Sequence, residues 1–301
     1  MTNPSRFSAT ILVRRAAAGG LLVLPSVAWW TARDQPSWVA MWAVASSEFL
    51  ALKLVTLAMA NWRIISPSRA FAYVALWPGM DAGAFLFDRR GRIPVVRLGE
   101  LGWALLKLLS GLLACVWATQ YVDSGHALLV GWVGMIGIIF TLHFGLLHVI
   151  SWWWRRIGVD APPIMRAPIA ADSLADFWGK RWNVAFADAA RGLLFRPTVR
   201  WLGASWAGAL VFLVSGLVHE TVISLPARGG WGRPTLYFVL QAAGIAVEKS
   251  AGGKTLRLGC GFRGWAWMAF CTAVPLPLLF HAPFVHHVIV PFYQTLHDLI
   301  P

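Results

Sequence analysis

The 301-residue chain is too apolar for a soluble globular protein. Its residues are 58% hydrophobic and only 13% charged, and its mean hydropathy is +0.62, whereas a soluble domain carries about 25% charged residues. The formal net charge of +13 would suit nucleic acid in a soluble protein, but the cations lie mainly between apolar segments and form no long basic patch. Composition therefore indicates an integral membrane protein and argues against a nucleic-acid partner.

Eight apolar segments match the length of a membrane-spanning helix, which needs about 20 mainly apolar residues. They lie at 9–32, 37–60, 98–121, 127–154, 205–226, 233–250, 263–281 and 283–300. Within the first segment, Arg14 and Arg15 precede an apolar run from Ala16 to Trp30, which resembles the start of a signal peptide. The many later segments favour a first membrane helix instead.

The distribution of Lys and Arg between these segments predicts the orientation. Cations are frequent in the loops at 61–97, 155–200 and 249–263, and there are none in the loop at 121–127. Loops rich in Lys and Arg thus alternate with loops that contain few or none. Because cytoplasmic loops of membrane proteins carry the excess of Lys and Arg, the cation-rich loops are predicted to be cytoplasmic. We predict a single all-α domain over residues 1–301, a polytopic transmembrane bundle of about eight spans with both termini in the cytoplasm.

One apolar segment before the third span does not read as a span. It runs from Phe71 to Phe87 and contains Pro78 and Gly79, which interrupt a helix, and Asp81. Because Pro breaks the helical hydrogen bonding that a lipid-exposed segment requires, we predict a re-entrant or interfacial piece.

A second unusual segment contains the sequence FWGKRWN, residues 177–183. Ser173 with Asp176 three residues later is a typical helix start, and aromatic residues then recur at helical spacing among charged ones. The pattern predicts an amphipathic helix at the membrane interface. Lys180 and Arg181 could hold phosphates and Asn183 offers a donor and an acceptor. A lipid anchor, with Trp at the headgroups, explains the composition equally well.

Ionisable side chains within apolar spans carry the default expectation of a function and a partner, because they are costly in lipid. The candidates are Glu48, Lys53, Lys107, His143, His148, His219, Glu220 and Glu248. His143 and His148 are five residues apart, which disfavours a shared metal ion. They could line a polar cavity or form buried hydrogen bonds. Glu48 and Lys53 are also five apart, so each should meet a partner on another helix.

His219 is the most informative of these residues, because it lies deep in an apolar helix and histidine can exchange a proton near neutral pH. Ser215 lies four residues earlier on the same helix face, and Glu220 is rotated by about 100°. A general base and a neutral histidine bonded to a carbonyl both fit the local sequence. A Ser–His nucleophile pair is disfavoured, since Ser in a membrane helix usually bonds its own backbone.

Three motifs together resemble the membrane-bound O-acyltransferase superfamily, and its wax synthase-like branch in particular. They are SLADFWGKRWN at Ser173–Asn183, FRP at Phe195–Pro197 and FLVSGLVHE at Phe212–Glu220. LWPGMD at Leu76–Asp81, YFVLQAAGIAVEKS and the closing LPLLFHAPFVHHVIVPF also resemble this branch, which occurs in bacteria, plants and fungi. The resemblance extends from about residue 70 to the end.

The resemblance implies transfer of a fatty acyl group from acyl-CoA to the hydroxyl of a lipophilic acceptor, such as a long-chain alcohol, a sterol or a terpenoid. It implies His219 as general base and Asn183 as a polar catalytic partner, with no metal, no covalent intermediate and acyl-CoA as a co-substrate rather than a cofactor. We assign substrate binding to Trp178, Lys180, Arg181, Trp182, Ser215 and Glu220. Membrane lipids are the expected surroundings, in a bacterial inner membrane.

Several points stay open in the sequence. The acceptor, the acyl length and the oligomeric state have no sequence signal, and no role follows for Gln241 or for Glu248. His281, His286, His287 and His297 lie near span ends, where solvation is cheap, and receive no role. A proton-coupled transporter using the buried ionisable groups is the alternative function, and a noncatalytic lipid-binding scaffold is a third.

Overall fold

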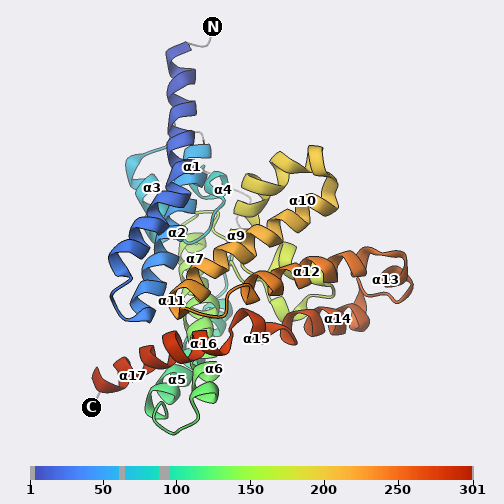
Figure 1. Cartoon of the computed structure of the whole chain (residues 1–301). Coiled ribbons are helices and arrows are strands. Elements are labelled where there is room, and N and C mark those ends of the chain that lie inside the picture. Colours follow the sequence, from blue (N-terminus) through green and yellow to red (C-terminus); the bar gives the residue numbers. More distant parts are fainter. Residues whose placement is uncertain (1–3, 61–64, 88–94, 300–301) are drawn as a thin grey trace.

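The computed structural model describes residues 4–60, 65–87 and 95–299, and these ranges form helices and connecting loops without strands (Figure 1). The helical elements of the first half are α1 (Pro4–Ala32), α2 (Ser37–Met59), α3 (Pro67–Phe71), η2 (Ala72–Leu76), α4 (Ala82–Leu86), α5 (Leu98–Gln120), α6 (Ala127–Ile139), η3 (Phe140–Leu146) and α7 (Leu147–Arg156). The predicted all-α class is confirmed over the described residues.

The second half contains shorter elements around two long helices. They are η4 (Pro168–Ala170), α8 (Leu174–Asp176), η5 (Phe177–Arg181), α9 (Val184–Ala190), η6 (Arg191–Phe195), α10 (Arg196–His219), η7 (Glu220–Ser224), α11 (Leu225–Ala227), α12 (Arg233–Lys249), α13 (Ala251–Thr255), α14 (Gly261–Ala273), α15 (Leu276–Leu279), α16 (Ala282–Phe284), η8 (Val285–Ile289) and α17 (Val290–Leu299). All η elements are π-helical except η4, a 3₁₀ turn.

Each predicted span coincides with helix, but fewer helices meet the requirements for crossing a membrane. By length and composition, the described residues contain four such helices: Ser37–Met59, Leu98–Gln120, Ala127–Arg156 and Val184–Ala227. A bent pair, Gly261–Leu279 and Ala282–Leu299 with 59° between its halves, would make five. The predicted number of about eight is not confirmed, because α12 has only 17 residues and the part of α1 whose side chains the structure describes begins at Ala17.

A kink divides α10 at Gly203. The backbone there has φ 72° and ψ 166°, outside the helical region and accessible mainly to glycine. The chain reverses direction at this point, and two limbs of α10 are visible in Figure 1. The span predicted at 205–226 corresponds to the limb after the kink.

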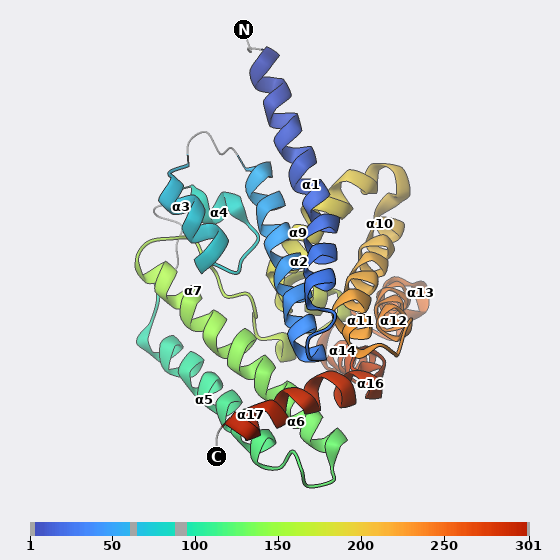
Figure 2. The same cartoon turned by 60° about the vertical axis from the view of Figure 1, so that its left-hand side comes forward.

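The first long helices form two antiparallel hairpins, one of α1 with α2 and the other of α5 with the α6–η3–α7 rod (Figures 1 and 2). Glycines allow the second hairpin to pack closely. A Cβ at Gly145 would lie 2.6 Å from Leu108 Cα, and one at Gly111 would lie 2.3 Å from Thr141 N. Small residues at such contacts are the usual means of packing helices in a membrane.

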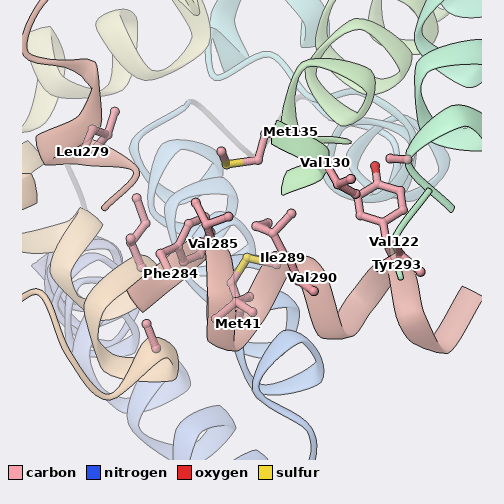
Figure 3. Packing of buried hydrophobic residues seen from close by; sticks show 14 of the residues in the cluster. Met41, Val122, Val130, Met135, Leu279, Phe284, Val285, Ile289, Val290 and Tyr293 are labelled. Atoms are coloured by element: carbon pink, nitrogen blue, oxygen red, sulfur yellow. The ribbon is translucent and has the colours of Figure 1, made fainter. Parts of the chain in front are cut away.

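The bent pair Gly261–Leu279 and Ala282–Leu299 forms a C-terminal arm. A cluster of buried apolar side chains packs this arm against α6 and α2 (Figure 3). Val285 and Tyr293 in the arm are fully buried and lie against Val130 and its neighbours in α6. The Tyr293 hydroxyl donates a hydrogen bond to the Gly134 carbonyl at 2.8 Å. The last two predicted spans therefore form one bent arm packed across the bundle.

The segment from Phe71 to Phe87 is broken as predicted. The π-helical η2 ends at Leu76, and Asp81 caps α4 by accepting a hydrogen bond from the Ala84 N–H at 2.9 Å. Lys53 of α2 donates to the Gly79 carbonyl at 2.6 Å and lies 3.2 Å from the centre of the Tyr73 ring. Part of the adjoining cationic loop, 61–64 and 88–94, lies outside the described residues.

The expectation of cheap solvation at His281 is wrong. This residue is only 1% exposed. Its Nδ1 accepts a hydrogen bond from the Phe284 N–H at 3.2 Å, and its Nε2 lies 3.3 Å from the Ser224 hydroxyl. His281 therefore serves as a buried cap that connects α16 to η7.

Candidate active site

The orientation of the His219 ring follows from one hydrogen bond. Its Nδ1 lies 2.7 Å from the carbonyl oxygen of Ser215, one turn earlier in α10. Because a carbonyl oxygen can only accept, Nδ1 must carry the hydrogen. In the neutral ring, the lone pair is then on Nε2, so this contact selects the tautomer in which Nε2 is the base.

The second nitrogen of His219 is available for chemistry. Within the described part of the chain, Nε2 has no hydrogen-bonding partner, and the residue keeps accessible surface although protein packs around it. The ring packs against Phe238 of α12 in a tilted arrangement, with 4.5 Å between ring centroids. The neutral histidine bonded to a carbonyl and the general base are therefore compatible, because they use different nitrogens.

The hydroxyl of Ser215 does not form a nucleophile pair with His219. It donates to the Val211 carbonyl at 2.8 Å, in the local backbone bond expected for serine in a membrane helix. The histidine contacts the main-chain oxygen of Ser215 instead. Ser215 therefore acts on His219 through its backbone.

Glu220 holds the first turn of α12. Its Oε1 accepts hydrogen bonds from the Thr235 N–H at 3.0 Å and from the Thr235 hydroxyl at 2.8 Å, and the side chain is buried. The N–H groups of a first helical turn lack partners within the helix, and a carboxylate satisfies them well. Gly216 allows the close approach, since a Cβ there would lie 2.7 Å from Thr235 Cα.

The helix that carries FWGKRWN begins at the predicted residue and ends within the motif. Ser173 Oγ accepts from the Asp176 N–H at 3.0 Å, which confirms the cap. The helix ends after Arg181, because Trp182 is extended and Asn183 adopts the left-handed conformation, φ 40° and ψ 61°. Asparagine tolerates this conformation better than most residues. The motif is therefore divided between a short helix and a turn before α9.

Asn183 is fixed through its backbone. Its N–H points to Met165 Sδ at 3.2 Å, and its carbonyl accepts from the Ala187 N–H at 3.2 Å. Its side-chain amide has no hydrogen-bonding partner among the described residues. The structure describes no contact between this amide and His219, so their cooperation stays a prediction.

The two cations of the motif differ in their surroundings. Arg181 forms an ion pair with Asp176, whereas Lys180 is 79% exposed and 3.8 Å from the same carboxylate. Arg191 also reaches this segment, donating to the Gly179 carbonyl at 3.2 Å. Lys180 is thus the more available of the two predicted phosphate ligands.

Aromatic side chains bring the two motifs together around Phe238. Trp178 lies 5.7 Å from Phe238 and 5.8 Å from Phe212, measured between ring centroids. Its indole N–H donates to Gln241 Oε1 at 3.2 Å. The other predicted tryptophan, Trp182, stacks on Phe177 and meets Phe144 of η3.

Most buried ionisable groups outside this site meet partners on other elements, as predicted. Glu48 of α2 accepts from the hydroxyl of Thr221 in η7, and His148 of α7 bridges two residues of α5, at 2.8 Å from Lys107 and 2.9 Å from Glu100. Glu100 also pairs with Arg155. Buried hydrogen bonding thus accounts for His148, while Nδ1 of His143 is buried without a partner in the described ranges.

The sequence analysis did not single out Thr235 or Phe238 and gave Gln241 no role, yet these three residues connect α12 to Glu220, His219 and Trp178. Their three-residue spacing places them on one face of a helix, and this was the available signal. Among the described residues, no group of three or more His, Cys, Asp or Glu could hold a metal ion.

Comparison with known proteins gives these contacts a context. Residues 161–240 match the model of the membrane bound O-acyl transferase family. This range includes Asn183, His219 and the first part of α12. The chain is thus similar to this family over part of its length, and together with the long apolar helices the match supports an integral membrane protein.

The curated relatives are plant acyltransferases. The chain is 38% identical over 140 residues to a long-chain-alcohol O-fatty-acyltransferase of Simmondsia chinensis, with 40% of each chain covered. It is 38% identical over 109 residues to a probable long-chain-alcohol O-fatty-acyltransferase 9 of Arabidopsis thaliana, with 32% of each covered. An acyl-CoA–sterol O-acyltransferase of Arabidopsis thaliana is 28% identical over 131 residues, which is 40% of this chain and 38% of the relative. The chain thus covers well under half of each relative.

The Glu220 contacts predict a stability effect. Glu220→Ala leaves the partly buried Thr235 N–H without its acceptor, which should destabilise the protein by about 1–3 kcal/mol. Glu220→Gln keeps an acceptor oxygen and should lose much less. Thermal unfolding in detergent, monitored by size-exclusion chromatography, measures the difference. Equal melting of wild type and Glu220→Ala would contradict the assigned anchoring role.

Proposed function

We propose that this protein is an acyl-CoA-dependent O-acyltransferase that esterifies a lipophilic alcohol. The observation that carries the proposal is the free Nε2 of His219, held in its basic tautomer inside an apolar helix bundle. The names of the relatives support a fatty acyl donor, with a long-chain alcohol or a sterol as acceptor. A terpenoid alcohol is chemically similar and belongs to the same acceptor class.

His219 acts as general base in the proposed reaction. Its Nε2 takes the hydroxyl proton of the acceptor as the acceptor oxygen attacks the thioester carbonyl carbon. The tetrahedral intermediate then collapses, the C–S bond breaks, and the CoA sulfur leaves with the proton from Nε2. The Ser215 carbonyl stabilises the transient imidazolium through Nδ1–H. The hydroxyl of Ser215, bonded to Val211, is not needed as a nucleophile.

The remaining motif residues bind the two substrates. Asn183 has an unengaged amide, which can donate to the oxyanion of the tetrahedral intermediate. Trp178 and Trp182 provide apolar surface for the acyl chain and acceptor, and Lys180 provides an exposed positive charge for the CoA phosphates. Acyl-CoA is a co-substrate in this scheme, and the scheme includes no cofactor.

The proposal is tested with purified protein in detergent, an acyl-CoA and a panel of long-chain, sterol and terpenoid alcohols. Wild type should form an ester and release CoA, measured together by mass spectrometry. His219→Ala should lose about 10²–10⁴-fold in rate, the usual contribution of a general base. His287→Ala is a matched control, because its Nδ1 also contacts a main-chain carbonyl, that of Ala227 at 2.8 Å.

The possible outcomes separate the competing functions. Full activity of His219→Ala, in a protein as monodisperse as wild type, would remove His219 from catalysis. An equal loss in His287→Ala would indicate a structural effect. A wild type that neither binds nor consumes acyl-CoA would overturn the acyltransferase proposal and favour transport, which the same protein in liposomes would reveal as solute or proton flux.

We further propose an orientation in a cytoplasmic membrane in which the cation-rich loops face the cytoplasm, as positive charge in short loops directs. The loop at 121–126 would lie on the opposite side, and the eight-crossing topology is the arrangement that the charge pattern favours. In a chain without its native cysteines, Ser124→Cys should react with an impermeant maleimide in intact cells. Ala170→Cys should react only after permeabilisation, and the reverse pattern would overturn the orientation.

A further inference from the structure

One face of α12 contacts both motifs of the site. Thr235 binds Glu220, Phe238 supports the His219 ring, and Gln241 accepts from Trp178. Glu248 extends this face by seven residues, or two helical turns. From Thr235 to Glu248 the helix rises by about 20 Å. Both motifs therefore contact the same helix at fixed positions along its length.

Glu248 holds the start of the FWGKRWN helix. Its Oε2 accepts a hydrogen bond of 2.7 Å from the Leu174 N–H, across 74 positions of sequence, and the side chain is only 6% exposed. Ser173 Oγ satisfies the Asp176 N–H in the same turn. The unpaired donors of this helix start thus have two acceptors, one local and one supplied by α12.

Close packing around this contact leaves little room for α8 to shift along α12. A Cβ at Gly244 of α12 would lie 2.7 Å from Leu174 Cδ2, so α12 and α8 are in close contact. Trp267 of α14 donates to the Gly244 carbonyl at 3.2 Å, and Ala171, Leu174 and Met268 form a buried apolar cluster beside it. The carboxylate of Glu248 therefore meets the motif helix at a packed and fixed point.

We propose that Glu248 is a positioning residue for the acyl-transfer site. By fixing Leu174 to α12, it sets the place of Trp178 and of the turn at Asn183 relative to His219, which rests on the same helix. The 35 residues between Asn183 and His219 then need not determine this geometry. Glu248 acts through the motif helix and not on substrate, since Gln241 already lies about 10 Å nearer to the His219 end. This inference rests on the proposed acyltransferase function.

Kinetics and hydrogen–deuterium exchange of the full chain in detergent test the role together. Glu248→Ala should lower kcat by about 10- to 100-fold, because a displacement of about 1 Å at a reacting geometry can cost 10²-fold. Amide exchange in residues 174–182 should rise at least about tenfold as their helix start loses its acceptor, with α5 unchanged. Glu248→Gln keeps an acceptor oxygen and should stay within about threefold of wild type in both measurements.

Ser250→Ala is the matched control at the same end of α12. Ser250 caps α13 by accepting from the Gly253 N–H at 3.0 Å, so its loss removes a cap outside the motif. It should leave kcat and exchange in residues 174–182 unchanged.

Each other outcome decides the question. Unchanged exchange in Glu248→Ala would show that Glu248 does not hold the motif helix, and raised exchange with normal kcat would make its role purely structural. Either result overturns the proposal, as does an equal kcat loss in Ser250→Ala. A wild type that makes no ester would overturn the proposed function instead, and the exchange rates would then still decide whether Glu248 fixes the segment.

Discussion

A carbonyl oxygen accepts hydrogen bonds and cannot donate them, and this constraint determines what His219 can do. The Ser215 carbonyl requires the hydrogen on Nδ1 and leaves the lone pair of the neutral ring on Nε2. Nothing in this arrangement needs a catalytic serine or a metal ligand.

Acyl transfer also requires the acceptor hydroxyl to lie close to Nε2 and to the acyl group at the same time. Helix α12 contacts the residues that would hold both substrates. It supports the His219 ring through Phe238 and receives the indole of Trp178 through Gln241. Its two ends are fixed by carboxylates, since Glu220 binds its first turn and its own Glu248 binds the motif helix. A helix only 17 residues long thus joins motifs that are far apart in sequence.

The sequence predicted well what depends on local composition. The all-α class, the positions of the apolar helices, the cap at Ser173 and the broken segment before α5 follow from hydropathy, cap residues and Pro–Gly chemistry. Contacts between elements that are far apart in sequence were harder to predict from the sequence. The burial of His281 depends on η7 and α16, and the ion pair of Arg181 with Asp176 depends on a π-helical turn that periodicity does not reveal. The predicted number of about eight spans is not confirmed for a related reason, because hydropathy does not register a bend such as that between α15 and α16, where two predicted spans form one bent pair.

The most direct test of this account is the protonation pattern of the His219 ring. Nitrogen-15 NMR of protein labelled at histidine, in detergent near neutral pH, gives separate shifts for protonated and unprotonated ring nitrogens, and the signal lost in His219→Ala identifies the residue. We predict a ring with a protonated Nδ1 and an unprotonated Nε2. A protonated Nε2, with or without a proton on Nδ1, would contradict the assignment of Nε2 as the base that accepts the hydroxyl proton.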